Sequence, residues 1–134
     1  MRDILFRGKR TDNGNWVQGS VFIRINDVYI IPLPIITSKS KVDPTTVGQY
    51  TGLTDINGKK IFEGDIVESH FTRKPYQVCY GEFSYTDEYG DNQEAYGWYN
   101  TEKDGYATAF ANPSGWATII GNIHDNPELL GGAE

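Results

Sequence analysis

The sequence lacks the features that mark secreted and membrane-spanning proteins. Its 134 residues include a single cysteine, Cys79, which excludes an intramolecular disulfide and favours a reducing compartment. No apolar run approaches the ~18 residues that a membrane-spanning helix needs, and residues 1–10 lack the apolar stretch of a secretion signal. We therefore expect a cytoplasmic protein that has no contact with membranes.

Basic residues are scarce in the second part of the chain, within an overall net charge of −6. Residues 1–74 hold 11 of the 12 lysines and arginines against 8 acids, which gives a net charge of +3. Residues 75–134 hold one basic residue, Lys103, against ten acids. Two interpretations stay open. The acids form an ordinary solvated surface, or they form an acidic face for a basic partner or for head-to-tail association between unlike halves of two copies.

Catalytic and cofactor-binding motifs are also missing. The chain has no Gly-x-Ser-x-Gly motif and no glycine-rich phosphate loop. The segments that start at Asp55 and Asp87 begin like calcium loops, but lysine, tyrosine, isoleucine and tryptophan stand where further ligands or a glycine belong. A zinc site needs a closed set of cysteine and histidine ligands. The chain offers three such residues: His70, Cys79 and His124. We expect no metal, no cofactor and no catalytic residues.

What the sequence does contain is β structure, and its 18 aromatic residues are enough to build a core. Apolar and polar residues alternate around 21–26, and a second apolar run at 28–31 follows at the distance of a tight hairpin. Together with the short apolar run at 4–7, these residues predict an N-terminal β-meander over 1–36. Residues 37–46 are polar and lack a period, which predicts a loop or linker.

Residues 47–134 contain several turn signals between short apolar runs. Asn57-Gly58 predicts a type I′ hairpin turn, and residues 76–80 alternate as in a strand. This pattern resembles the start of a small SH3-like barrel, an analogy of fold that implies no function. Residues 126–130 fit a short helical turn. The predicted fold is mainly β: an N-terminal meander packed with a small, strongly bent, SH3-like β-barrel and closed by a short C-terminal helical turn, in one cooperative domain.

Residues 81–105 form an insert within 47–134 that is rich in acidic and aromatic residues, with seven acids and six aromatics. We expect a long hairpin or an exposed loop. Aromatic side chains supply large contact area at interfaces, and loops on a rigid scaffold often carry function. The hypothesis is an interaction surface made of seven residues: Tyr85, Asp87, Tyr89, Asp91, Glu94, Tyr96 and Trp98. The competing interpretation is that these aromatic residues complete the core.

Two long motifs resemble the YopX-like family that bacteriophages and prophages encode. The first covers Val47–Leu53 and Asp55–Val67, and the second is the ending, Ile119–Leu130. The start of the chain is similar too, whereas 81–115 matches least. The resemblance implies a small phage-borne cytoplasmic protein of Gram-positive hosts and brings no catalytic residues. The glycine, asparagine and aspartate residues of these motifs suit turns, which indicates a folding signature.

Three function classes remain. The first is a non-catalytic phage accessory protein that binds a host or phage protein, as a homo-oligomer. The alternative is a nucleic-acid-binding module that uses the basic N-terminal half, where Arg7, Lys9 and Arg10 lie near Trp16. The second alternative is a small hydrolase that depends on the carboxylates of 82–104.

Overall fold

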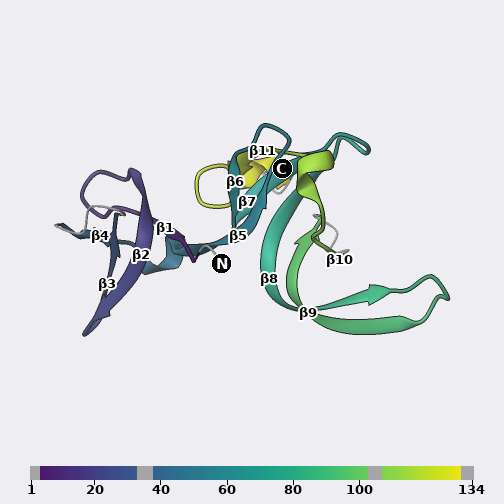
Figure 1. Cartoon of the computed structure of the whole chain (residues 1–134), viewed down its shortest axis with the longest axis horizontal. Helices are drawn as coiled ribbons and strands as arrows, with labels where there is room; N and C mark the ends of the chain where they lie inside the picture. The colour runs from purple at the N-terminus through teal and green to yellow at the C-terminus, as the bar shows by residue number, and fades with distance from the viewer. Residues whose placement is uncertain (1–3, 33–37, 103–106, 131–134) are drawn as a thin grey trace. The chain divides into compact units, whose positions relative to one another are not determined.

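The computed structural model describes residues 4–32, 38–102 and 107–130, and these residues are mainly β (Figure 1). They form two antiparallel sheets, of six strands in the order β4-β3-β2-β1-β5-β6 and of five strands in the order β10-β9-β8-β7-β11. The prediction of a mainly β protein is confirmed. No closed barrel is present in the described ranges, because the outer strands of the five-stranded sheet, β10 and β11, do not pair with each other.

The strands differ widely in length. Those of the first sheet are β1 (Phe6–Lys9), β2 (Trp16–Arg24), β3 (Asp27–Ile31), β4 (Ser40–Val42), β5 (Gly48–Thr54) and β6 (Lys60–Phe62). Those of the second sheet are β7 (Asp65–Ser69), β8 (Pro75–Thr86), β9 (Asn92–Thr101), β10 (Ala107–Ala109) and β11 (Ala117–Asn122). The helical elements are three 3-10 turns, η1 (Pro44–Thr46), η2 (Pro113–Gly115) and η3 (Pro127–Leu130). No α-helix occurs among the described residues, and η3 is the helical turn that the C-terminal sequence predicts.

The chain divides into two compact units, Met1–Gly52 and Leu53–Glu134. In the first unit, β1, β2, β3 and β4 pair consecutively as an antiparallel meander. The segment predicted as a loop or linker, 37–46, contains β4 and η1 in its described part. Val42 of β4 pairs with Val28 of β3 and makes a bridge to Arg10, so the meander has one strand more than predicted. Whether the chain unfolds as one cooperative domain stays a prediction.

The second unit packs its core from residues of several strands. Five side chains form one buried cluster: Ile61, Val67, Val78, Phe110 and Ala117. They come from β6, β7, β8 and β11 and from the segment before η2. In β8, Val78 belongs to this cluster and Tyr76, two residues before it, packs against it, as the period of two of a strand requires.

The longest element pair is the β8–β9 hairpin. Its register runs unbroken from Gln77 opposite Thr101 to Thr86 opposite Asn92, so the insert is the long hairpin that its sequence predicts. The neighbouring strands pair only with the base of this hairpin, β7 with residues 75–77 and β10 with 99–101. In Figure 1 the ribbon extends beyond the rest of the sheet and bends sharply.

Two glycines face each other within this ribbon. Gly81 and Gly97 are directly paired, with φ of 143° and 153°, a backbone conformation that residues with a side chain rarely adopt. We call residues 82–96, the part of the hairpin beyond this pair, the distal arm. No other strand pairs with the distal arm among the residues that the structure describes.

Candidate functional site

The tip of the distal arm is a turn organised by Asp87. One oxygen of its carboxylate, Oδ1, accepts hydrogen bonds from the backbone N–H groups of Tyr89 (2.9 Å) and Asp91 (3.0 Å). The other, Oδ2, accepts one from the side-chain amide of Gln93 (3.0 Å). The Gln93 hydrogen bond and the two backbone donors lower the pKa of Asp87. Asp87 is therefore an ionised group that holds the tip in one conformation.

One face of the ribbon carries a row of aromatic side chains. Tyr80 packs edge-on against Trp98 and Tyr96, with ring centroids 4.8 and 5.6 Å apart. Trp98 is half-buried and packs against the core cluster, whereas Tyr96 is 74% exposed. The register places Glu82 opposite Tyr96, and Glu94 follows on the same face. The row thus runs from the core out to solvent.

The other face of the ribbon is anchored by Phe83. This ring is buried, stacks on Tyr99 at 4.8 Å and lies 6.1 Å from the ring of Tyr85. Since successive residues of a strand point to opposite faces, Tyr85 lies on the face opposite Tyr96. At the tip, Tyr89 is 81% exposed.

The seven predicted surface residues therefore do not form one continuous patch. Three lie on one face of the ribbon, Glu94, Tyr96 and Trp98; one lies on the other, Tyr85; three lie in the tip turn, Asp87, Tyr89 and Asp91. The two interpretations of the insert, an interaction surface and a part of the core, each fit some of its residues. Phe83 and Trp98 contribute to packing, and the tip and Tyr96 face solvent.

The charge of the distal arm has one sign. Its 15 residues include five acids and no basic residue: Glu82, Asp87, Glu88, Asp91 and Glu94. No ion pair reaches these carboxylates within the described part of the chain. The arm therefore presents unneutralised negative charge beside exposed tyrosine rings.

A second surface lies on the meander of the first unit. The register pairs Arg7 with Gln18 and Lys9 with Trp16, and directly paired residues share a face of the sheet. The guanidinium carbon of Arg7 lies 4.7 Å from the centre of the Trp16 ring, and the Lys9 ammonium lies 5.8 Å from it. Both distances are in the range of a cation–π contact.

The same face continues along β2 to Phe22, which pairs with Tyr29 of β3. Their ring centroids are 6.0 Å apart, and the Lys39 ammonium lies 4.7 Å from the Tyr29 ring and 5.4 Å from the Phe22 ring. The opposite face carries Ile30 and Val42, which are 0% and 1% exposed. We call the outer face of the meander the aromatic face. Six residues define it: Arg7, Lys9, Trp16, Phe22, Tyr29 and Lys39.

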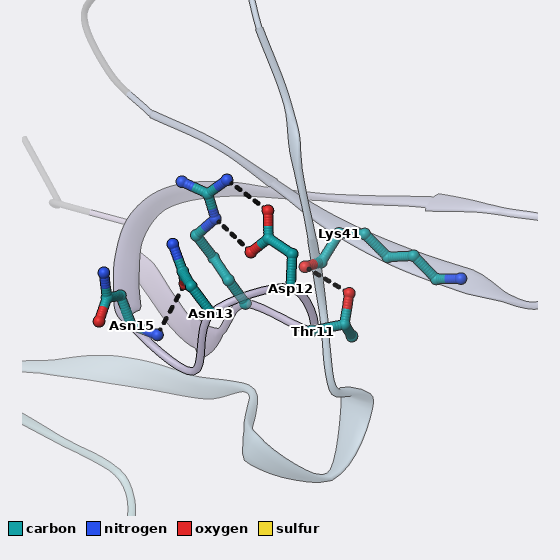
Figure 2. A network of polar contacts seen from close by, with 6 residues as sticks. Thr11, Asp12, Asn13, Asn15 and Lys41 are labelled. Atoms are coloured by element: carbon teal, nitrogen blue, oxygen red, sulfur yellow. Dashed lines mark hydrogen bonds and ion pairs between the residues drawn. The ribbon is translucent and has the colours of Figure 1, made fainter.

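Arg10, the third residue of the predicted basic cluster, does not belong to this face. It makes a two-pronged contact with Asp12, whose carboxylate oxygens lie 3.0 Å from Nε and 2.7 Å from Nη2. Figure 2 shows Asp12 in this turn, where the Thr11 hydroxyl donates to the Lys41 carbonyl oxygen at 3.5 Å. Of the predicted basic cluster, Arg7 and Lys9 lie beside the Trp16 ring, whereas Arg10 is paired with Asp12.

The histidines and the cysteine lie apart. Among the described residues, no group of three or more His, Cys, Asp or Glu side chains is arranged to hold a metal ion. Burial raises the pKa of the half-buried Cys79 thiol, an effect that the hydrogen bond to Tyr99 only partly opposes. The imidazole Nε2 of His70 lies 2.6 Å from the Thr118 hydroxyl.

None of the helical elements in the described ranges has the length and apolar character to cross a membrane.

Sequence reasoning missed the role of Asp55. Its Oδ1 accepts from the backbone N–H groups of Asn57 (2.9 Å) and Lys59 (3.0 Å), and its Oδ2 accepts from that of Ile119 (3.0 Å). Asp55 is 1% exposed. Burial by itself raises the pKa of this carboxyl, but the three backbone donors and the Lys59 charge outweigh it and lower the pKa.

The turn at Asp55 also differs from the type I′ turn that Asn57-Gly58 predicts. That turn needs positive φ at both residues, and only Gly58 has it, at 80°. The backbone bonds are Asp55 N–H to the Lys59 oxygen and Gly58 N–H to the Asp55 oxygen. The tip at Asp87 repeats the pattern, with Asp91 and Gly90 in the same places. An aspartate three residues before a glycine is the signal that identifies both turns.

Other residues of the two motifs also satisfy backbone groups. The Asp65 carboxylate accepts from the Phe62 N–H at 2.7 Å, within the turn between β6 and β7. The Asn122 side-chain oxygen accepts from the N–H groups of His124 and Asp125, both at 2.9 Å. These contacts give the motif residues a structural role in the turns.

No curated protein matches the sequence. A family model described as YopX protein matches residues 5–131. The matched span includes both sheets, the distal arm, the aromatic face and the turn at Asp55. Because the match covers nearly the whole chain, and because the residues of the two motifs form its turns, the chain belongs to the YopX family.

Proposed function

We propose that this phage-associated YopX protein is a non-catalytic binding module whose contact surface is the distal arm. The observation that carries the proposal is the isolation of the arm, a two-stranded ribbon that no other strand pairs with in the described part of the chain. An isolated two-stranded hairpin is marginally stable in water. A partner that covers the ribbon supplies the missing stabilisation.

The side chains of the arm suit a protein partner. Tyr89 and Tyr96 expose most of their surface, and tyrosine gives large contact area at a low cost in conformational entropy. The five carboxylates favour a basic surface and repel the phosphates of nucleic acid. The proposed partner is therefore a host or phage protein in the host cytoplasm that has a basic contact surface. This partner can also be a second copy of this chain, in a homo-oligomer.

The hydrolase alternative has less support. A general acid or nucleophile among carboxylates works in a site that shields it from water and tunes its pKa. Glu82 and Glu94 are exposed on the ribbon, and Asp87 is committed to the backbone of its own turn.

The test replaces Tyr89, Asp91 and Glu94 together by alanine. All three are exposed, so the free energy of unfolding should change by no more than ~1 kcal/mol. Affinity capture from phage-infected host lysate, together with sedimentation analysis of the pure protein, should show a bound protein or a self-association that the triple variant loses.

The matched control is Phe71→Ala, because Phe71 is 80% exposed near the tip of the β7–β8 hairpin. It should retain the partner. The proposal is refuted if the triple variant binds the same proteins as the wild type, or if Phe71→Ala loses them equally. A sharp fall in the melting temperature of the triple variant would assign the arm to the core instead.

A further inference from the structure

We infer that the aromatic face of the first unit binds single-stranded nucleic acid, by stacking bases on Trp16, Phe22 and Tyr29. This inference is independent of the distal arm. Proteins that bind single strands without sequence preference combine basic side chains with exposed aromatic rings, on which successive bases stack. The outer face of β1, β2 and β3 carries basic side chains beside the exposed Phe22 ring and the half-buried Trp16 and Tyr29 rings.

The geometry of the face fits an extended strand of nucleotides. Trp16 and Phe22 lie on the same face of β2, six residues apart, which is about 20 Å along an extended chain. Gln18 and Ser20 lie between them on that face and are exposed, so the path between the two rings is open to solvent. Phe22 itself is 39% exposed.

Cations flank the rings at both ends of this path. Lys9 lies beside Trp16, and Lys39 lies beside Phe22 and Tyr29, all within 6 Å of a ring centre. Their long side chains place ammonium groups beside the rings, where a nucleic-acid strand stacked on those rings would carry its phosphates. Arg7 also lies beside Trp16, but its Nε and Nη2 are buried, so it supports the ring rather than the ligand. Lys41 pairs with Asp27 at 3.4 Å and adds no net charge to the face.

The charge of the first unit favours an anionic ligand. Residues 1–52 contain seven basic and four acidic residues, a net charge of +3 within a chain whose total is −6. Positive charge therefore gathers on the unit that carries Trp16, Phe22 and Tyr29. A duplex hides the faces of its bases in the stack, so rings on an open sheet favour single strands.

The test measures the fluorescence anisotropy of labelled 12-nucleotide oligo-dT and oligo-U with the full chain, at about 50 and 200 mM salt. We expect saturable binding that is weaker at the higher salt concentration. The Phe22→Ala variant should bind about tenfold more weakly. The Lys39→Gln variant should lower the slope of log affinity against log salt by about 0.7, the value for one phosphate contact on a single strand.

Two controls separate stacking from a general loss of structure. Ile23→Ser changes the neighbouring residue on the opposite face of β2, which is 69% exposed, and should leave the affinity unchanged. The Tyr89, Asp91 and Glu94 triple variant should also bind both oligonucleotides, so a failure of the arm hypothesis is distinguishable from a failure of this one.

The inference is overturned if neither oligonucleotide binds at about 50 mM salt at protein concentrations near 100 μM, where even non-specific binding is measurable. Equal affinity for a duplex of the same length would also overturn it, because stacking on rings requires unpaired bases. Equal losses in Phe22→Ala and Ile23→Ser would show that the aromatic ring makes no specific contribution.

Discussion

The buried carboxylate of Asp55 and the half-buried carboxylate of Asp87 organise the same kind of turn, and this pair allows a controlled prediction. Each accepts hydrogen bonds from two backbone N–H groups of its own turn. Asp55 alone also bonds to a distant strand, through the Ile119 N–H. We expect Asp55→Ala to destabilise the protein strongly and Asp87→Ala to have a much smaller effect.

The magnitude for Asp55 follows from its three partners. A hydrogen bond to a charged group contributes about 1.5–3 kcal/mol, and a buried donor left without an acceptor costs about 1–3 kcal/mol. Asn57 and Lys59 are exposed, so water replaces part of what their N–H groups lose, whereas Ile119 is only half-exposed. The expected loss for Asp55→Ala is about 3–4 kcal/mol, a large share of the ~5–15 kcal/mol of a typical domain.

The assay is urea unfolding followed by tryptophan fluorescence. With a slope near 2 kcal/mol per molar, the midpoint of Asp55→Ala should fall by about 2 M, and that of Asp87→Ala should stay close to the wild type. If Asp55→Ala does not fold, Asp55→Asn keeps one acceptor oxygen and should give an intermediate midpoint. Equal midpoints for Asp55→Ala and Asp87→Ala would refute the argument that burial and the Ile119 contact decide the difference.

Three further predictions follow from the same structure. The pKa of Asp55 is lower in the folded than in the unfolded state. The stability that the ionised carboxylate gives the folded protein is therefore complete above pH ~4 and is lost as the pH falls through the folded pKa. The urea midpoint of Asp55→Asn should vary less between pH 5 and 3 than that of the wild type. Gly97→Ala places a side chain at a φ of 153° and should cost about 1–3 kcal/mol, whereas Ser84→Ala, on the exposed ribbon, should leave the urea midpoint unchanged. Cys79 should react with a thiol reagent much more slowly in the folded than in the urea-unfolded chain, because burial raises the pKa of its thiol; equal rates would contradict this.

Local pattern predicted the elements whose residues lie close together in sequence. The alternation at 21–26 and the run at 28–31 identified the β2–β3 hairpin, and residues 126–130 identified η3. Strand β4 was not predicted, because three residues are too few to show an alternation of apolar and polar side chains. Its pairing also depends on Val28 and Arg10, which lie far away in the sequence.

The same limit applied to the candidate sites. The acidic and aromatic composition of 81–105 predicted a long hairpin or an exposed loop, but only the register separates Tyr85 from Tyr96 on opposite faces. The link from Asp55 to Ile119 spans 64 residues, and no local signal reveals it. The prediction of a barrel was wrong for a similar reason. Closure of a sheet into a barrel depends on pairing between its outermost strands, which the turns do not determine.

The reach of the distal arm also bears on the speed of association. Each of its strands continues for five residues beyond the Gly81–Gly97 pair, about 16 Å, which exceeds the ~10 Å over which salt screens charge at 0.1 M. An approaching cationic surface therefore meets the field of the tip before that of the sheet behind it. Such steering acts on the rate of encounter, so added salt should slow the formation of a complex more than it hastens its dissociation, which the tyrosine contacts govern.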